Sequence, residues 1–340
     1  MSLNDIWFAL FIAVIAGYVI LDGFDLGVGI LHLFAGTNDQ ERRVILNSIG
    51  PIWDGNEVWL VVGGGVLFAA FPMVYAAMFS GFYWALMLVL LFMILRTVAI
   101  EFRSKREKPQ WRRRWDAVFS VSSYALALLL GVALGNVVAG VPLTASGDIQ
   151  ISNVFDLLKP FPDLVGLTAI AMLALHGGLY LEVKTEGDIH DRVRAWLPGI
   201  AAIFVVLGLT VVAFAAAKDY TVVQPFKDSP WLVVFPLGAA AGFGLIWFFR
   251  RKGRDVAAFF SSCGMLALLL ISAGVGMYPT LLPSTTDPAY SMTVTNSASA
   301  SETLTVMLIV AIIGLPFVLL YTAGVQYLFR GKVKLASDSY

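Results

Sequence analysis

GPIWDGNEVWL, residues 50–60, opens a long apolar run and carries two acids, Asp54 and Glu57, into it. The two acids are three residues apart, so both project from one face of the helix that is expected to continue through residues 61–75. A carboxylate in hydrocarbon is costly unless it is paired, protonated or hydrated. An acid pair at this place therefore predicts a functional site.

The composition of the whole chain is that of an all-α integral membrane protein. Hydrophobic residues make up 59% and charged residues 14% of the 340 residues, and the mean hydropathy is +0.80. The formal net charge is zero, so there is no basic footprint for nucleic acid, and the single cysteine, Cys263, excludes an intrachain disulfide framework. The first apolar run lacks a basic region before it and contains Asp22 and Asp25, so we expect a retained span and not a cleaved signal.

A membrane span needs about 20 mainly apolar residues. Nine segments meet this criterion, and together they predict one polytopic domain over residues 1–340, with spans 1–4 in residues 1–138, spans 5–8 in residues 162–278 and span 9 at 304–329. The predicted limits are 6–34, 53–76, 80–101, 116–138, 162–184, 196–217, 231–249, 256–278 and 304–329.

The distribution of basic residues predicts the orientation. The stretches that follow the odd-numbered spans hold 19 of the 23 lysine and arginine residues, whereas the opposite loops hold only Lys159, Lys218 and Lys227. By the positive-inside rule the N-terminus is outside and the C-terminus is cytoplasmic. A faint similarity between LDGFDLGVGIL (residues 21–31) and LHGGLYLEV (residues 175–183) indicates two related halves of four spans plus one extra helix.

This orientation brings five ionisable groups into one layer nearer the cytoplasm than the midplane. They lie in the first three spans: Asp22, Asp25, Asp54, Glu57 and Arg96. In span 1, His32 shares a helix face with the two aspartates, and Gly23 and Gly27 form a GxxxG that permits close helix packing. Such a layer suits proton uptake from the cytoplasm, because each group can hold and pass a proton.

A structural role competes with this interpretation at every position. Arg96 could simply pair with an aspartate, and Asp54 and Glu57 could cap a helix at the interface. His176 is expected to be a satisfied interior histidine more readily than a cofactor contact, and Glu182 to reach only the interface. The basic run at 103–114 is expected to be a solvated anchor, and Trp59 a core or belt aromatic.

Several kinds of chemistry have no motif in the sequence. There is no Walker motif, GxGxxG after a strand, CxxC or HExxH, which leaves ATP-driven and zinc chemistry without support, and no metal site is predicted. The three histidines, His32, His176 and His190, are too few and too scattered to ligate several haems. If electrons are transferred, another chain must hold the cofactors.

Five stretches together resemble subunit II of the cytochrome bd quinol oxidases. They are LDGFDLGVGIL (21–31), NDQERRVILNSIGPIWDGNEVWL (38–60), FAAFPMVYAAMFSGFY (68–83), RTVAIEFRSK (96–105) and PSTTDPAYSMTVTNSAS (283–299). The resemblance implies nine spans in two four-helix bundles with a peripheral helix, and a heterodimer with a subunit I that carries haems b and d and the quinol site. It further implies that the complex reduces oxygen to water, with electrons from quinol and protons from the cytoplasm.

The resemblance also implies roles for individual residues. The proposed proton path of the family matches Asp25 and Asp54, its span-3 arginine matches Arg96, and a tryptophan at the oxygen entry matches Trp59. Glu57 is glutamine in some relatives, and His176 falls where some relatives have a side chain that does not titrate. The resemblance leaves open which quinol is used, and whether a small accessory subunit, a lipid or a quinone binds this chain.

Two other functions compete with the oxidase. A proton-coupled secondary transporter would also use buried acids and glycine-interrupted helices, but it predicts a site at the midplane and a chain that works alone. A purely structural subunit would use the polar layer only to lock helices together.

Overall fold

The computed structural model describes residues 2–335 and is almost entirely helical. Its α-helices are α1 Leu3–Ala35, α2 Asp39–Ile49, α3 Trp53–Ala70, α4 Pro72–Gly81, α5 Tyr83–Phe102, α6 Pro109–Ala139, α7 Pro160–Lys184, α8 Asp188–Ala217, α9 Gln224–Asp228, α10 Val234–Arg251, α11 Asp255–Met277 and α12 Ser301–Leu328. Short 3₁₀ turns, η1 to η5, lie at Arg103–Lys105, Val154–Leu157, Thr221–Val223, Pro230–Val233 and Pro288–Tyr290. Two short strands, β1 Thr280–Leu282 and β2 Met292–Thr293, pair antiparallel.

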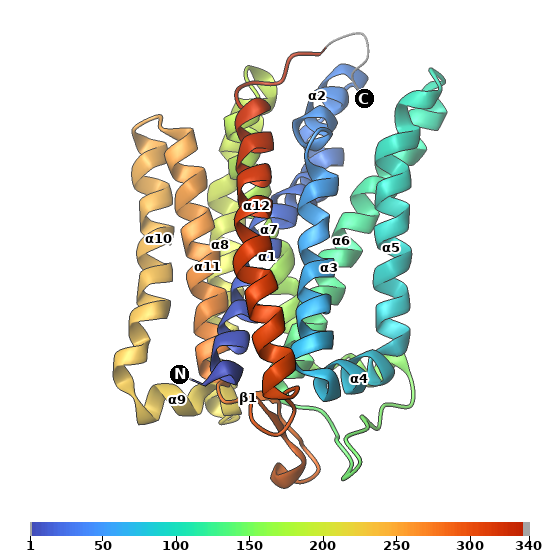
Figure 1. Cartoon of the computed structure of the whole chain (residues 1–340). Coiled ribbons are helices and arrows are strands. Elements are labelled where there is room, and N and C mark those ends of the chain that lie inside the picture. Colours follow the sequence, from blue (N-terminus) through green and yellow to red (C-terminus); the bar gives the residue numbers. More distant parts are fainter. Residues whose placement is uncertain (1, 336–340) are drawn as a thin grey trace.

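Eight helical segments are long and apolar enough to cross a membrane: Leu3–Ala35, Tyr83–Lys105, Pro109–Ala139, Pro160–Lys184, Asp188–Ala217, Pro230–Arg251, Asp255–Met277 and Ser301–Leu328. They agree with eight of the nine predicted spans. The long helices run side by side, and α1 and α12 both start at the end of the bundle where the short α4 and α9 lie across it (Figure 1). The chain is therefore a multi-pass membrane protein.

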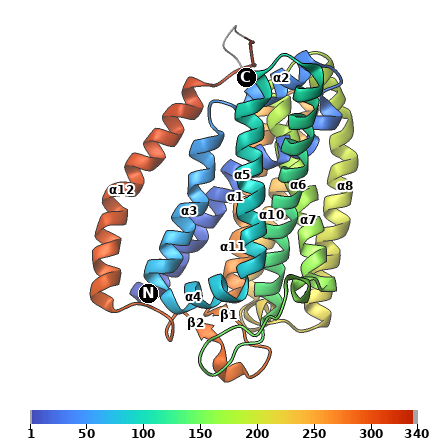
Figure 2. The ribbon, with the colours of Figure 1, turned by 90° about the vertical axis from the view of Figure 1, so that its right-hand side faces the viewer.

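The second predicted span, 53–76, is wrong at its far end. The helix that contains Asp54 and Glu57 is only 18 residues long and ends at Ala70. Phe71 then leaves the helical region, with φ −133° and ψ 63°, and Pro72 starts α4, which lies across the end of the bundle (Figure 2). A proline disfavours the helical conformation of the residue before it, which accounts for the break.

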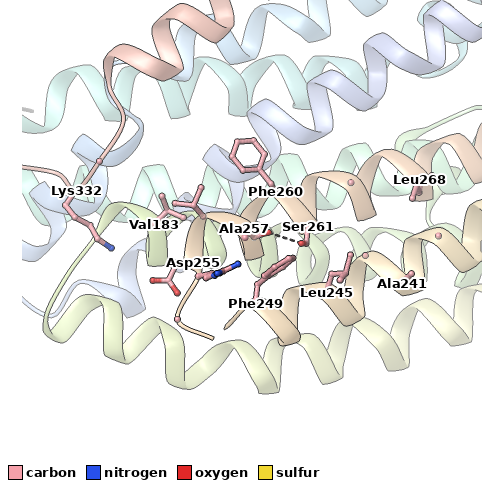
Figure 3. Close-up of a pocket in the computed structure, with 17 residues that line it drawn as sticks. Val183, Ala241, Leu245, Phe249, Asp255, Ala257, Phe260, Ser261, Leu268 and Lys332 are labelled. Atoms are coloured by element: carbon pink, nitrogen blue, oxygen red, sulfur yellow. Dashed lines mark hydrogen bonds between the residues drawn. The ribbon is translucent and has the colours of Figure 1, made fainter. Parts of the chain in front are cut away.

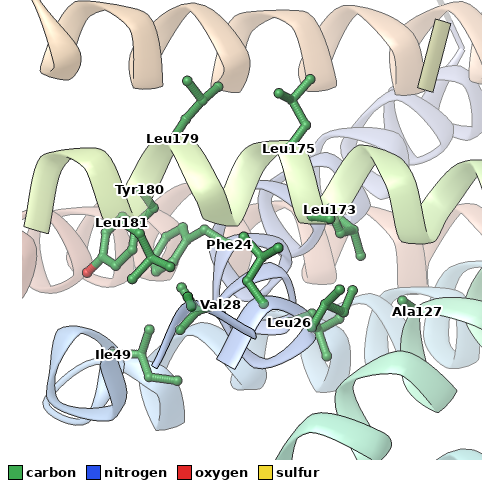
Figure 4. Packing of buried hydrophobic residues seen from close by; sticks show 14 of the residues in the cluster. Phe24, Leu26, Val28, Ile49, Ala127, Leu173, Leu175, Leu179, Tyr180 and Leu181 are labelled. Carbon is green, nitrogen blue, oxygen red and sulfur yellow. The ribbon is translucent and has the colours of Figure 1, made fainter. Parts of the chain in front are cut away.

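The centre of the molecule is the contact between α1 and α7, which the figure of the buried core shows (Figure 4). Phe24 of α1 stacks on Tyr180 of α7 with ring centroids 4.2 Å apart. The two backbones touch, because a Cβ atom at Gly27 would lie 1.9 Å from the carbonyl oxygen of Leu173, and one at Gly177 would lie 2.4 Å from the carbonyl carbon of Gly27. Only glycine permits this approach, as the GxxxG pattern predicts.

The loops at the α4 end of the bundle are ordered and pack on it. In the segment after α6, Val141 N donates to the carbonyl oxygen of Pro283, which follows β1, and Ser299 N donates to that of Ala70. In contrast, α12 stands apart from the other helices over most of its length, and Leu304 is its one buried residue (Figure 2). A helix that is apolar all round and buried nowhere else faces lipid or another chain.

Candidate functional site: a buried polar cluster in the first four long helices

The glycine contact with α7 fixes the rotation of α1, so that its two aspartates face α3 and α5. Asp22 forms a bidentate ion pair with Arg96 of α5: Nη2 lies 2.5 Å from Oδ1 and Nη1 lies 3.1 Å from Oδ2. Both side chains are 1% exposed. Burial and the fork geometry make this pair the polar centre of the first bundle.

Asp25 lies one helical turn further along α1 and has a different environment. Its carboxyl is fully buried, and its Oδ2 accepts a hydrogen bond of 2.8 Å from Nδ2 of Asn56. Its Oδ1 has no hydrogen-bond partner among residues 2–335. A carboxyl group with one oxygen unengaged has room for a proton on that oxygen, so Asp25 is chemically suited to carry one.

The acids of α3 lie between this cluster and the outer surface. Glu57 is half-buried and within electrostatic range of Arg96, Asp22 and Asp54. Asp54 is exposed on the outward face of α3. Three of the predicted acids, Asp22, Asp25 and Glu57, therefore gather around Arg96. Asp54 adjoins them through Glu57, and no direct contact between Asp54 and Asp25 is formed in the described chain.

Trp59 lies on the opposite face of α3, against α1. Its indole is buried with Val14 and Tyr18, and it fills the space above Gly17, where a Cβ atom would lie 2.8 Å from its ring. This is the environment of a core aromatic that sets the distance between α1 and α3.

A second buried cluster, which the sequence analysis missed, lies nearer the end of the bundle and centres on Asp116 at the start of α6. Its carboxylate accepts from His32 Nε2 at 2.7 Å, from Arg103 Nε at 2.5 Å and from Arg42 Nη1 at 3.2 Å. The expectation that the basic run 103–114 is solvated is wrong for Arg103, which is 1% exposed because it is enclosed by Asp116 and Asp39. The signal for it was an aspartate directly after the run RRRW.

A third cluster occupies the same place in the second half of the chain. Glu182, at the end of α7, accepts from Arg250 at 2.7 and 3.1 Å, and Arg194 pairs with Asp255 at 3.0 Å. The expectation that Glu182 reaches the interface is wrong, because its carboxylate is fully buried by this arginine. Sequence gave no sign of a partner 68 residues away.

The second and third clusters occupy corresponding positions, which supports an internal repeat. Each joins the end of the first helix of its half, the end of the third and the start of the fourth: His32, Arg103 and Asp116 in one, and Glu182, Arg250 and Asp255 in the other. The Asp22–Arg96 and Asp25 cluster has no such counterpart. Counting from the Gly27–Gly177 crossing, Met172 and Leu175 lie at the depth of Asp22 and Asp25. This register differs by four residues from that of the sequence similarity, which aligns Asp22 with His176.

His176 behaves as predicted, as a satisfied interior residue. Its Nδ1 is 2.7 Å from Ser262 Oγ, its Nε2 is 2.9 Å from the carbonyl oxygen of Ile20, and its ring stacks on Phe259. Both ring nitrogens of His190 contact aspartates, and the fully buried His32 binds Asp116. His176 and His190 do not fit the role of axial haem ligands, since both nitrogens of each ring are already engaged, whereas His32 Nδ1 is buried and has no hydrogen-bond partner among residues 2–335.

Comparison with known proteins gives one consistent result. A family model described as cytochrome bd terminal oxidase subunit II matches residues 3–329. The chain is 37% identical to cytochrome bd-I ubiquinol oxidase subunit 2 of Escherichia coli K12, over 97% of this chain and 95% of that one. It is 36% identical to cytochrome bd ubiquinol oxidase subunit 2 of Bacillus subtilis 168, over 98% and 97%. The fold is similar to a chain of the bd oxidase of Geobacillus thermodenitrificans, with a TM-score of 0.79, 17% identity, and 97% and 99% coverage.

Proposed function

Because the chain belongs to the family of subunit II of the cytochrome bd terminal oxidases, we propose that its buried polar cluster takes up protons from the cytoplasm for oxygen reduction in the partner subunit. The chain is one subunit of a bd-type quinol oxidase, an oxidoreductase complex of the respiratory chain in the bacterial inner membrane. This membership removes the reason to favour a secondary transporter that works alone.

The proposed topology has nine spans, with the N-terminus outside and the C-terminus in the cytoplasm. The ninth span is α3, whose 18 residues make about 27 Å of helix, close to the hydrocarbon thickness of about 30 Å. The first four-helix bundle is α1, α3, α5 and α6, the second is α7, α8, α10 and α11, and α12 is peripheral. The corresponding charge clusters at one end of each half support this division.

The haems are proposed to lie in subunit I. Haems b and d are what the family resemblance implies for the complex, and they supply its redox chemistry. This assignment is supported by His176 and His190, whose ring nitrogens are all engaged, and by His32, whose Nε2 is held by Asp116. The outward face of α3 is a suitable contact surface for that partner, because it is apolar at Val58 and Val61 and has open space at Gly64 and Gly65.

The proposed path runs between the outward face of α3 and the buried Asp25. Asp54 lies at the exposed end, Glu57 is intermediate, and Asp25 is the buried carrier, positioned by Asn56. The Asp22–Arg96 pair is proposed to be a fixed charge pair that positions the cluster, since both Asp22 oxygens already accept from the guanidinium. The buried Asp25 with one unengaged oxygen is the observation that carries the proposal.

Replacement of Asp25 by Asn tests this assignment. Asn keeps the size and the contact with Asn56 but cannot carry a proton. We expect quinol-dependent oxygen consumption to fall by about 10²-fold, the lower end of what a positioned proton-transfer group contributes, with unchanged haem spectra. Asp25→Glu, which restores a carboxyl, should recover part of the rate. Wild-type turnover in Asp25→Asn, at normal haem content, would refute the path.

Oxygen access past Trp59 is a second proposed contribution of this chain. Its support is the packing of the indole on Gly17 in the contact between α1 and α3, where a smaller side chain would leave an apolar opening between the two helices. Trp59→Phe should therefore change the apparent affinity for oxygen and leave the maximal rate unchanged, which oxygen-electrode traces at low oxygen measure.

A further inference from the structure

A long groove runs along the outer side of α10 and α11, away from the polar cluster of the first half. It has a volume of about 1140 Å³ and is lined by these two helices, by Val183 and by the segment after α12 at Gly331 and Lys332 (Figure 3). Its two ends differ in chemistry. In the close-up, Lys332 and Asp255 lie toward one end, and Leu268 and Ala241 lie toward the other.

The polar end carries positive charge that no acid of the described chain neutralises. Lys332 Nζ donates to two neutral carbonyl oxygens, those of Glu182 at 2.8 Å and Thr185 at 2.7 Å. Arg254 is exposed and has no side-chain hydrogen bond or ion pair among residues 2–335. Asp255, the acid nearest to it in sequence, is already paired with Arg194.

The start of α11 adds to this positive end. Its N-cap residue, Arg254, makes no side-chain capping bond, so the N–H groups of the first turn lack a side-chain acceptor. Residues 255–257 of that turn line the groove. An anion placed between Arg254, Lys332 and this helix start would meet two cations and the positive end of the helix dipole.

The rest of the groove is apolar and is opened by small residues. Leu245, Phe260 and Leu268 line it. A Cβ atom added at Gly264 would meet nothing within 4 Å, so at this position the groove is empty of protein atoms. A long apolar channel beside a basic end is the shape and polarity of a phospholipid, with acyl chains along the helices and the phosphate at their ends.

We propose that this groove binds an anionic phospholipid, with its phosphate between Arg254 and Lys332 and its acyl chains along α10 and α11. Basic pockets between membrane helices at the cytoplasmic side are sites for anionic headgroups. The lipid would hold the 331–333 segment against the end of α7. Val333 N already donates a hydrogen bond to the carbonyl oxygen of Lys184 there. The placement of this lipid in the inner leaflet rests on the proposed orientation of the chain, whereas the proposed binding does not depend on that orientation.

The test uses the whole purified complex in nanodiscs that contain equal amounts of phosphatidylglycerol and phosphatidylethanolamine. Native mass spectrometry then counts the lipids that stay bound after release from the disc. Gly264→Leu fills the groove, and we expect it to abolish the retained phosphatidylglycerol. Arg254→Gln should lower its occupancy about fivefold, the contribution of one basic residue near an anionic lipid.

Two matched variants make the result specific. Gly244→Leu places the same side chain in open space on α10 but outside the groove, and Arg251→Gln removes an exposed charge that does not line it. Both should retain wild-type lipid. Equal phosphatidylglycerol in the wild type and Gly264→Leu would overturn the proposal, as would equal retention of the two headgroups, or recovery of a quinone in place of a lipid. None of these outcomes depends on the proton path.

Discussion

Replacing Asp22 by Asn removes one charge of a fully buried ion pair and leaves the guanidinium of Arg96 without its bidentate partner. Loss of one member of a buried pair costs about 3–5 kcal/mol, because the remaining charge stays buried. Asp25 and Glu57 lie within electrostatic range of Arg96 and compensate in part, so we expect the lower end of this range. The double variant Asp22→Asn with Arg96→Gln has no stranded charge and should lose less than the sum of the single variants.

Equilibrium unfolding of the complex in mixed micelles, followed by helical circular dichroism, measures the four free energies of this cycle. Haem content is recorded in parallel to show that the subunits remain assembled. We expect a coupling energy of at least about 1 kcal/mol, within the range for residues in one network. If the single losses simply add, the two side chains do not depend on one another, and the assignment of Asp22 and Arg96 as a positioning pair is refuted.

Two further predictions concern helix packing and pH. Gly27→Ala should prevent assembly of the complex, because its Cβ atom would lie 1.9 Å from a backbone oxygen of α7. Gly55→Ala is the matched control and should assemble normally, because its Cβ atom would have nothing within 4 Å. The yield of haem-loaded complex measures assembly in both variants. Burial opposes ionisation of Glu41 in α2, but hydrogen bonds from Arg192 and Thr37 outweigh it and lower the pKa of Glu41 from 4.5 to about 2. This lowered pKa stabilises the fold above pH 4.5, and the stabilisation is lost as the pH falls toward 2, so the melting temperature of Glu41→Gln should drop less than that of the wild type on acidification; an equal drop in both would contradict this role.

Much of the fold could be predicted because each membrane span is specified by a short, continuous stretch of sequence. Each span is a continuous apolar run, and eight of the nine predicted runs coincide with a long apolar helix. The exception also had a local signal, since Pro72 disfavours helix at Phe71, but hydropathy alone carries no information about backbone conformation. The polar cluster could be located because a charged residue in an apolar run is rare enough to be noticed singly.

What could not be predicted was the pairing of charges near the helix ends. Arg103 and Glu182 lie in stretches where charged residues normally face water, and nothing local separates them from their solvated neighbours. Their partners, Asp116 and Arg250, become neighbours only when the helices pack. The sequence therefore indicated how many charges lie near each membrane surface, but not which of them are enclosed.

The correspondence between the two halves separates structural from functional charge in this chain. A bundle of four membrane helices needs its ends fixed, and both halves do so with the same kind of cluster, around Asp116 in one and around Glu182 and Asp255 in the other. The second half shows that such a bundle packs with Met172 and Leu175 at the depth where the first has Asp22 and Asp25. Buried acids at that depth are thus not required by the architecture. They carry a desolvation cost that the second half avoids, and this difference supports the functional role that we propose for them.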